Sequence, residues 1–227
     1  MKKLFSLLLA ICMVFAFNSC GKQPVNKSNK DTAKKKSIVT SEKASANTTS
    51  VKKSKTYENF LKIVSGDTFL VTMKIGDQDT ASTLTSAKKD GKLYNDVLSP
   101  KGNFTTITKE NKNYILLKDK KTFTVSAATA DGSSAPDMSK KDMFDTKAYD
   151  TLNFTTGKTE IDGKSYDYEE YFKSGITLRY CFIGDQLKYM IMTSSDGKVS
   201  KVEFLKVTND VPDTLFDVPS DYQETTT

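Results

Sequence analysis

The residues that could perform chemistry in this chain of 227 residues are few, and their types exclude the commonest catalytic designs. The sequence contains no His, one Arg and three Cys, so it offers neither imidazole acid–base catalysis nor a His-ligated metal site. It has no Gly-x-Ser-x-Gly elbow, no Asp-x-Asp-x-Asp-Gly calcium loop and no Gly-rich phosphate loop before a helix. We therefore predict that the chain is not an enzyme and uses no metal or cofactor.

One pair of acidic residues has a spacing compatible with chemistry. Asp167 and Glu169 alternate with Tyr166 and Tyr168, which places both carboxylates on one face of a strand about 7 Å apart. That spacing suits a glycosidase pair or a cation site. The alternation is also typical of a strand with one face in water, and no third acid follows at a fixed spacing. We interpret the two acids as a solvent-facing strand surface.

The cysteines indicate export and lipidation. Lys2 and Lys3 precede an apolar run over residues 4–17, which is shorter than the roughly 20 residues that span a bilayer. Residues 1–19 are therefore predicted to be a cleaved signal peptide. Residues 17–21 resemble a bacterial lipobox, in which Cys20 would receive a diacylglycerol and become the new N-terminus. The alternative is an ordinary secretory signal.

Lipidation would leave one thiol in the mature chain. Cys12 departs with the signal and Cys20 is acylated, so an intrachain disulfide is not possible. Cys181 lies in an apolar run and has no His partner, which predicts a buried, unreactive side chain. The resulting hypothesis is a lipoprotein anchored to the cell membrane on its extracytoplasmic face.

The positive charge of the chain is concentrated in the segment 20–55. Ten Lys stand there against two acids, while residues 56–227 carry a net charge of −4. Large apolar residues are almost absent from this segment, which predicts a disordered tether. Without Arg or aromatic residues, the tether is unsuited to nucleic acid, so we predict no nucleic-acid partner. Two interpretations of the tether remain open. It contacts anionic lipid headgroups or wall polymers, or it is only a solvated spacer.

A β-rich domain is predicted over residues 56–223, followed by a disordered tail at 224–227. An amphipathic helix opens the domain, with Thr56 as its N-cap and an apolar stripe that ends at Gly66. The period then changes to two, and turn dipeptides such as Asp90-Gly91 and Asp162-Gly163 separate successive strands. We expect nine to eleven strands in one large antiparallel sheet.

The late strands are apolar on both faces, which requires a second cover for the sheet. Candidate covers are the first helix and a short helical piece within residues 140–149. Large sheets curl or close. The predicted fold class is therefore mainly β (α+β), with a curved antiparallel sheet that forms an unclosed barrel around an N-terminal helix and a second short helical segment.

The chain resembles the LolA-like superfamily of envelope lipoproteins in three stretches, residues 163–169, 180–189 and 211–222. The resemblance covers residues 56–223 and is strongest toward the end. It implies an unclosed β-barrel with helices in its concavity that binds the acyl chains of lipids or lipoproteins. The single Arg179 lies in a late strand, whereas the soluble carriers of the superfamily use an Arg at the barrel mouth, so transport of other lipoproteins is not implied.

Our functional hypothesis is that this domain, as a monomer, binds a hydrophobic ligand such as a lipid or acyl chain, or an acylated partner. The candidate lining residues are flexible or aromatic side chains of the predicted strands: Phe69, Met73, Tyr180, Phe182, Tyr189, Met190 and Met192. Their strand spacing is equally compatible with an ordinary packed core. The alternative function is an envelope protein-interaction or sensory module that uses the same fold with a filled interior.

Overall fold

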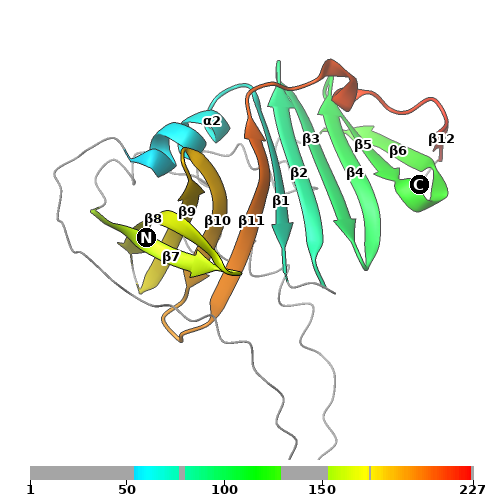
Figure 1. Ribbon diagram of the computed structural model, residues 1–227. Coiled ribbons are helices and arrows are strands. Elements are labelled where there is room, and N and C mark those ends of the chain that lie inside the picture. The colour runs from blue at the N-terminus through cyan, green and yellow to red at the C-terminus, as the bar shows by residue number, and fades with distance from the viewer. Residues whose placement is uncertain (1–53, 77–79, 129–152, 174, 226–227) are drawn as a thin grey trace, which may run out of the picture.

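The computed structural model describes residues 54–76, 80–128, 153–173 and 175–225, which form one twisted sheet of 12 strands (Figure 1). In spatial order the sheet runs β12-β6-β5-β4-β3-β2-β1-β11-β10-β9-β8-β7. The first six strands in sequence are β1 (Phe69–Ile75), β2 (Ser82–Lys89), β3 (Lys92–Ser99), β4 (Gly102–Lys109), β5 (Lys112–Leu117) and β6 (Thr122–Ala127). The others are β7 (Phe154–Ile161), β8 (Lys164–Lys173), β9 (Ile176–Ile183), β10 (Gln186–Thr193), β11 (Val199–Thr208) and β12 (Gln223–Glu224).

Tight Asp-Gly turns of the predicted kind connect β2 to β3 and β7 to β8. Asp90 and Gly91 both have positive φ angles, of 50° and 74°, and Asp162 and Gly163 repeat the pattern with 51° and 76°. Two central residues with positive φ define the hairpin turn whose twist matches that of antiparallel strands. These two Asp-Gly hairpins, predicted from the sequence, are therefore confirmed. Asp196-Gly197, which the sequence also predicts to be a hairpin turn, lies instead in the longer loop between Thr193 and Val199, where Gly197 has a positive φ angle and Asp196 does not.

The N-terminal helix consists of the π-helical turn η1 (Tyr57–Leu61) and the single turn α2 (Lys62–Val64). Phe60, Leu61 and Val64 are buried, as the apolar stripe predicts. The predicted N-cap is wrong, because Thr56 has helical backbone angles and its side chain makes no capping hydrogen bond. Glu169 of β8 accepts the backbone N–H groups of Lys55 and Thr56 instead, at 2.7 Å and 2.9 Å. A local sequence pattern does not reveal a cap supplied from a distant strand.

The two halves of the sheet bury opposite faces, and the buried face changes at β1. Phe69, Val71 and Met73 of β1 belong to a cluster under the N-terminal helix that also contains residues of β8 to β11. Leu70 points to the opposite face and joins a second cluster with residues of β2, β4 and β5. β1 therefore buries side chains on both faces, with Phe69, Val71 and Met73 on one and Leu70 on the other. We call the helix side face A and the other side face B.

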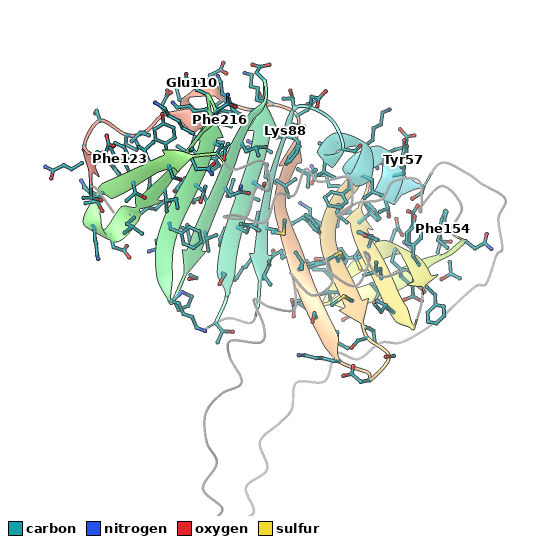
Figure 2. The ribbon with its side chains drawn as sticks, turned by 180° about the vertical axis from the view of Figure 1, so that it is seen from behind. Tyr57, Lys88, Glu110, Phe123, Phe154 and Phe216 are labelled. Atoms are coloured by element: carbon teal, nitrogen blue, oxygen red, sulfur yellow. The ribbon has the colours of Figure 1, made fainter. Side chains whose placement is uncertain are left out.

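The C-terminal strap, residues 209–225, covers face B of β2 to β6. It includes the short 3-10 helix η3 (Asp213–Phe216), whose Phe216 is 1% exposed. Figure 2 shows Phe216 over this half of the sheet, with Tyr57 of the N-terminal helix at the other half. Three ion pairs tie the strap to lysines at the strand ends: Lys89–Asp213 at 3.0 Å, Lys109–Asp217 at 3.9 Å and Lys121–Asp221 at 2.8 Å.

The fold is therefore mainly β, with a sheet that is not closed into a barrel, because the end strands β12 and β7 do not pair with each other in the described structure. Every pair is antiparallel except β12–β6, which is parallel. The count of 12 exceeds the predicted nine to eleven. The second helical segment at 140–149, the signal peptide and Cys20 lie outside the described residues.

Candidate functional site

The predicted lining residues are brought together, but in a packed core. Phe69, Met73, Tyr180 and Phe182 belong to the cluster under the N-terminal helix, where none is more than 6% exposed. Phe60 of the helix packs at 6.3 Å from Tyr180, measured between ring centroids. The described contacts leave these four side chains surrounded by protein. Contact between them and a ligand stays a prediction.

The other three predicted residues are on β10. Met190 packs against the same cluster, and Met192, which is 7% exposed, shares its face. Tyr189 points to face B and meets Tyr166 in an edge-to-face contact at 5.3 Å between ring centroids. Burial raises the pKa of the Tyr189 phenol, so this group stays neutral at physiological pH. The sequence pattern grouped Tyr189 with residues of the opposite face.

An apolar ladder that sequence reasoning missed crosses face A of the early strands. Met73, Leu84, Val97, Phe104 and Leu117 are successive cross-strand partners on β1 to β5. Paired residues of neighbouring strands share a face, so the five side chains form one continuous row. With about 4.8 Å between strands, the row is about 19 Å long. We call this row the apolar ladder.

The apolar ladder leads from the core to the surface. Met73 is 6% exposed, whereas Phe104 and Leu117 are 38% and 41% exposed. The row beside it is polar, with Ser86, Asn95 and Thr106 as buried cross-strand neighbours. The Ser86 hydroxyl donates to Asn95 Oδ1 at 2.8 Å. An exposed apolar row flanked by satisfied polar groups is suited to contact with a linear apolar ligand.

A pocket of about 340 Å³ opens beside the N-terminal helix. It is lined by two residues of the helix, the turn into β10 and one stretch of β11: Asn59, Ile63, Asp185–Lys188 and Phe204–Val207. None of the seven predicted lining residues is among them. Ile63, Leu187 and Phe204 give the pocket an apolar floor, and polar and charged groups form its rim. We call it the helix pocket.

Both acids of the pair are engaged by neighbouring side chains or backbone groups. Asp167 is tied to Lys158 of β7 at 2.9 Å. Glu169 is 6% exposed and accepts hydrogen bonds from Ser54 Oγ at 2.6 Å and Tyr171 Oη at 3.1 Å, besides the two N–H groups of the helix start. The interpretation of Glu169 as solvent-facing is therefore wrong, because the carboxylate is enclosed by the donors that it anchors. Among the described residues, no cluster of acids or Cys could hold a metal ion.

Cys181 is buried, as predicted, and belongs to the aromatic cluster on face B. Burial raises the pKa of its thiol to about 12, so the reactive thiolate is scarce at neutral pH. Nearby, the guanidinium of Arg179 is 2.6 Å from Glu170 and 4.4 Å from the centre of the Tyr168 ring. Gly157 lies under that ring, where an added Cβ would meet it at 2.7 Å. These contacts form a packed structural layer.

The chain matches no protein-family model, and no curated protein sequence matches it significantly. A solved structure of an uncharacterized conserved protein from Thermus thermophilus is similar in fold, with a TM-score of 0.41, 11% identity, and coverage of 74% of this chain and 95% of the other.

Two further structures are similar at comparable or lower levels. One is MucB in complex with MucA(peri), with a TM-score of 0.40 and 10% identity over 75% of this chain and 61% of the MucB chain. The other is PNGF-II, with a TM-score of 0.27 and 11% identity over 70% of this chain and 31% of the other. These similarities are too distant to transfer a function.

The described part of the chain contains no helix with the length and apolarity to cross a membrane.

Proposed function

We propose that this chain is a membrane-anchored, extracytoplasmic lipoprotein whose β domain binds a hydrophobic ligand, either a lipid or the acyl chain of a modified partner. The observation that supports this best is the apolar ladder, which continues the buried core as an exposed row. Its length of about 19 Å is comparable to that of an extended long acyl chain. No catalytic step is assigned to the domain.

The energetics of such binding need no charged anchor. Burial of acyl methylenes against Phe104, Leu117 and Val97 contributes about 0.8 kcal/mol for each methylene removed from water. The ladder crosses strands that are hydrogen-bonded to one another, so the surface is already formed before a ligand arrives. A preformed apolar surface loses little entropy on binding.

The first test is uptake of an anthroyloxy-labelled palmitate by the full chain. Phe104→Asn with Leu117→Asn removes the two exposed ladder residues and is expected to weaken binding by about tenfold or more. Leu98→Asn is the matched control, because Leu98 is also 41% exposed but lies on face B of β3. Equal binding by the double variant and the wild type would exclude the ladder as the acyl site.

A second candidate function is an envelope protein-interaction or sensory module. The observation that favours it is the packed state of the core beneath the N-terminal helix, where Phe69, Tyr180 and Phe182 are each 1% exposed. A filled core leaves less room for an internal ligand. Mass spectrometry of organic extracts from the native protein distinguishes the two functions, since absence of bound lipid together with failure of palmitate uptake would favour the interaction module.

A further inference from the structure

The pairing between β10 and β11 ends early, beside the N-terminal helix. It runs from Thr193–Val199 to Tyr189–Glu203. Beyond this point the two strands separate: Leu187 of β10 pairs only with β9, and Phe204 of β11 pairs only with β1 in the described structure. Two strand edges therefore face each other without pairing, and the helix pocket lies between them.

A β-bulge marks each strand at this separation. In β10 the extra residue is Lys188, because Leu187 and Tyr189 oppose consecutive residues of β9. In β11 the extra residue is Leu205, because Phe204 and Lys206 oppose consecutive residues of β1. Bulges bend a strand and end local pairing, and they are frequent at functional sites. Here both bulged residues, Lys188 and Leu205, line the helix pocket.

The charges at the pocket rim favour an anionic group. Lys188 and Lys206 both line the pocket, and neither ammonium takes part in an ion pair among the described residues. The one acid of the lining, Asp185, lies 3.7 Å from Lys55 Nζ and is thereby partly neutralised. The rim is thus positive around an apolar floor, although the domain as a whole is acidic.

We propose that the helix pocket binds an extended peptide segment of a partner protein, with an apolar side chain on the floor and an acidic group beside Lys188 and Lys206. An extended peptide offers backbone donors and acceptors that match the free strand edges, and it adds side chains that fill a pocket. A fatty acid would satisfy the floor and one lysine but would leave both edges unpaired. The peptide therefore accounts for more of the observed geometry.

This inference is independent of the proposed acyl site, because Phe104 and Leu117 lie on β4 and β5, outside the pocket lining. The test is selection of a phage-displayed library of random linear peptides on the full chain held in phosphatidylcholine nanodiscs. Enriched peptides are expected to alternate apolar and acidic residues. N-methylation of their central backbone amides should abolish binding, because it removes the hydrogen-bond donors that an added strand needs.

Two charge reversals define the site. Lys188→Glu with Lys206→Glu is expected to weaken binding of the selected peptides by about tenfold or more, since like charges would then face each other. Lys101→Glu, at an exposed position in the turn between β3 and β4, is the control and should leave binding unchanged. Circular dichroism melting confirms that each variant folds.

Three outcomes would overturn the proposal. The first is that selection on the wild-type chain enriches peptides no more than selection on the double charge-reversal variant does. The second is enriched peptides whose affinity is unaffected by the reversal or by N-methylation. The third is that the double charge reversal abolishes binding of labelled palmitate but leaves peptide binding unchanged. That result would assign the pocket to an anionic amphiphile instead.

Discussion

At the scale of single residues, the carboxylate of Glu169 is the most consequential polar group of the described domain. It is nearly enclosed, and it accepts two backbone N–H groups and the Ser54 hydroxyl from the region where the predicted tether meets the domain, besides the hydroxyl of Tyr171 on its own strand. Lys55 strengthens the same junction by donating to the carbonyl of Gly184 at 3.1 Å. β8 therefore fixes where the chain enters the domain.

Glu169→Ala is expected to lower the free energy of unfolding by about 3 kcal/mol, because it leaves several partly buried donors without an acceptor. Urea unfolding measures this effect. Glu169→Gln retains one carbonyl oxygen and should cost less. The control is Glu160→Gln on the exposed side of β7. A loss below about 0.5 kcal/mol for the alanine variant would show that water replaces the carboxylate without cost.

The sequence alone could predict some of these residues and not others. Burial of Cys181 followed from its apolar neighbours. The burial of Glu169 did not, because its donors come from a segment more than a hundred positions away. Leu84 and Val97 are placed symmetrically about Asp90-Gly91, so the turn dipeptide contained the signal that they are paired. The ladder could have been found by extending each predicted hairpin outward from its turn.

At the scale of elements, the C-terminal strap depends on its apolar contacts more than on its charges. Its ion pairs with Lys89, Lys109 and Lys121 involve exposed carboxylates, and water and salt screen such pairs. Phe216 is instead buried beside Tyr94 in an edge-to-face contact at 6.5 Å between ring centroids. Burial also raises the pKa of Tyr94 to about 12.

Phe216→Ala is expected to lower the free energy of unfolding by about 3–5 kcal/mol, through lost burial and the cavity that remains. Phe172→Ala is a chemically identical control at a position that is 67% exposed, and it should change stability by no more than about 0.5 kcal/mol. Guanidinium titrations of both variants compare the two. Similar losses at the two positions would contradict the assignment of the strap as part of the core.

Hairpins were predictable at this scale because Asp-Gly turns specify both the connection and the register. The bulges at Lys188 and Leu205 were not predictable, since a bulge interrupts the alternation of the two strand faces at only one residue. The face change at β1 was also missed, because it depends on which distant segments cover each side. The expected unclosed sheet nonetheless agrees with the observed strand order.

At the scale of the whole molecule, the proposed anchor makes a clear prediction. Cys20→Ala should move the chain from the membrane to the soluble fraction, because it removes the thiol that would carry the diacylglycerol, and lysines alone give binding of about 1 kcal/mol each that salt weakens. Fractionation with and without a high-salt wash measures this. Retention of the variant after the wash would refute the lipid anchor, and a soluble wild type would indicate an ordinary secretory signal.

The position of β1 between β2 and β11 also has a consequence for the order in which the domain folds. β1 can pair with β2 across a short connection, but its other neighbour begins at Val199, more than a hundred residues further along the sequence. Until β1 and that neighbour pair, the aromatic side of the first helix, including Phe60, has no complete surface on which to fold. Residues of β11 must therefore be in place before this half can mature, and a chaperone that shields the unfolded chain would prevent aggregation in that interval.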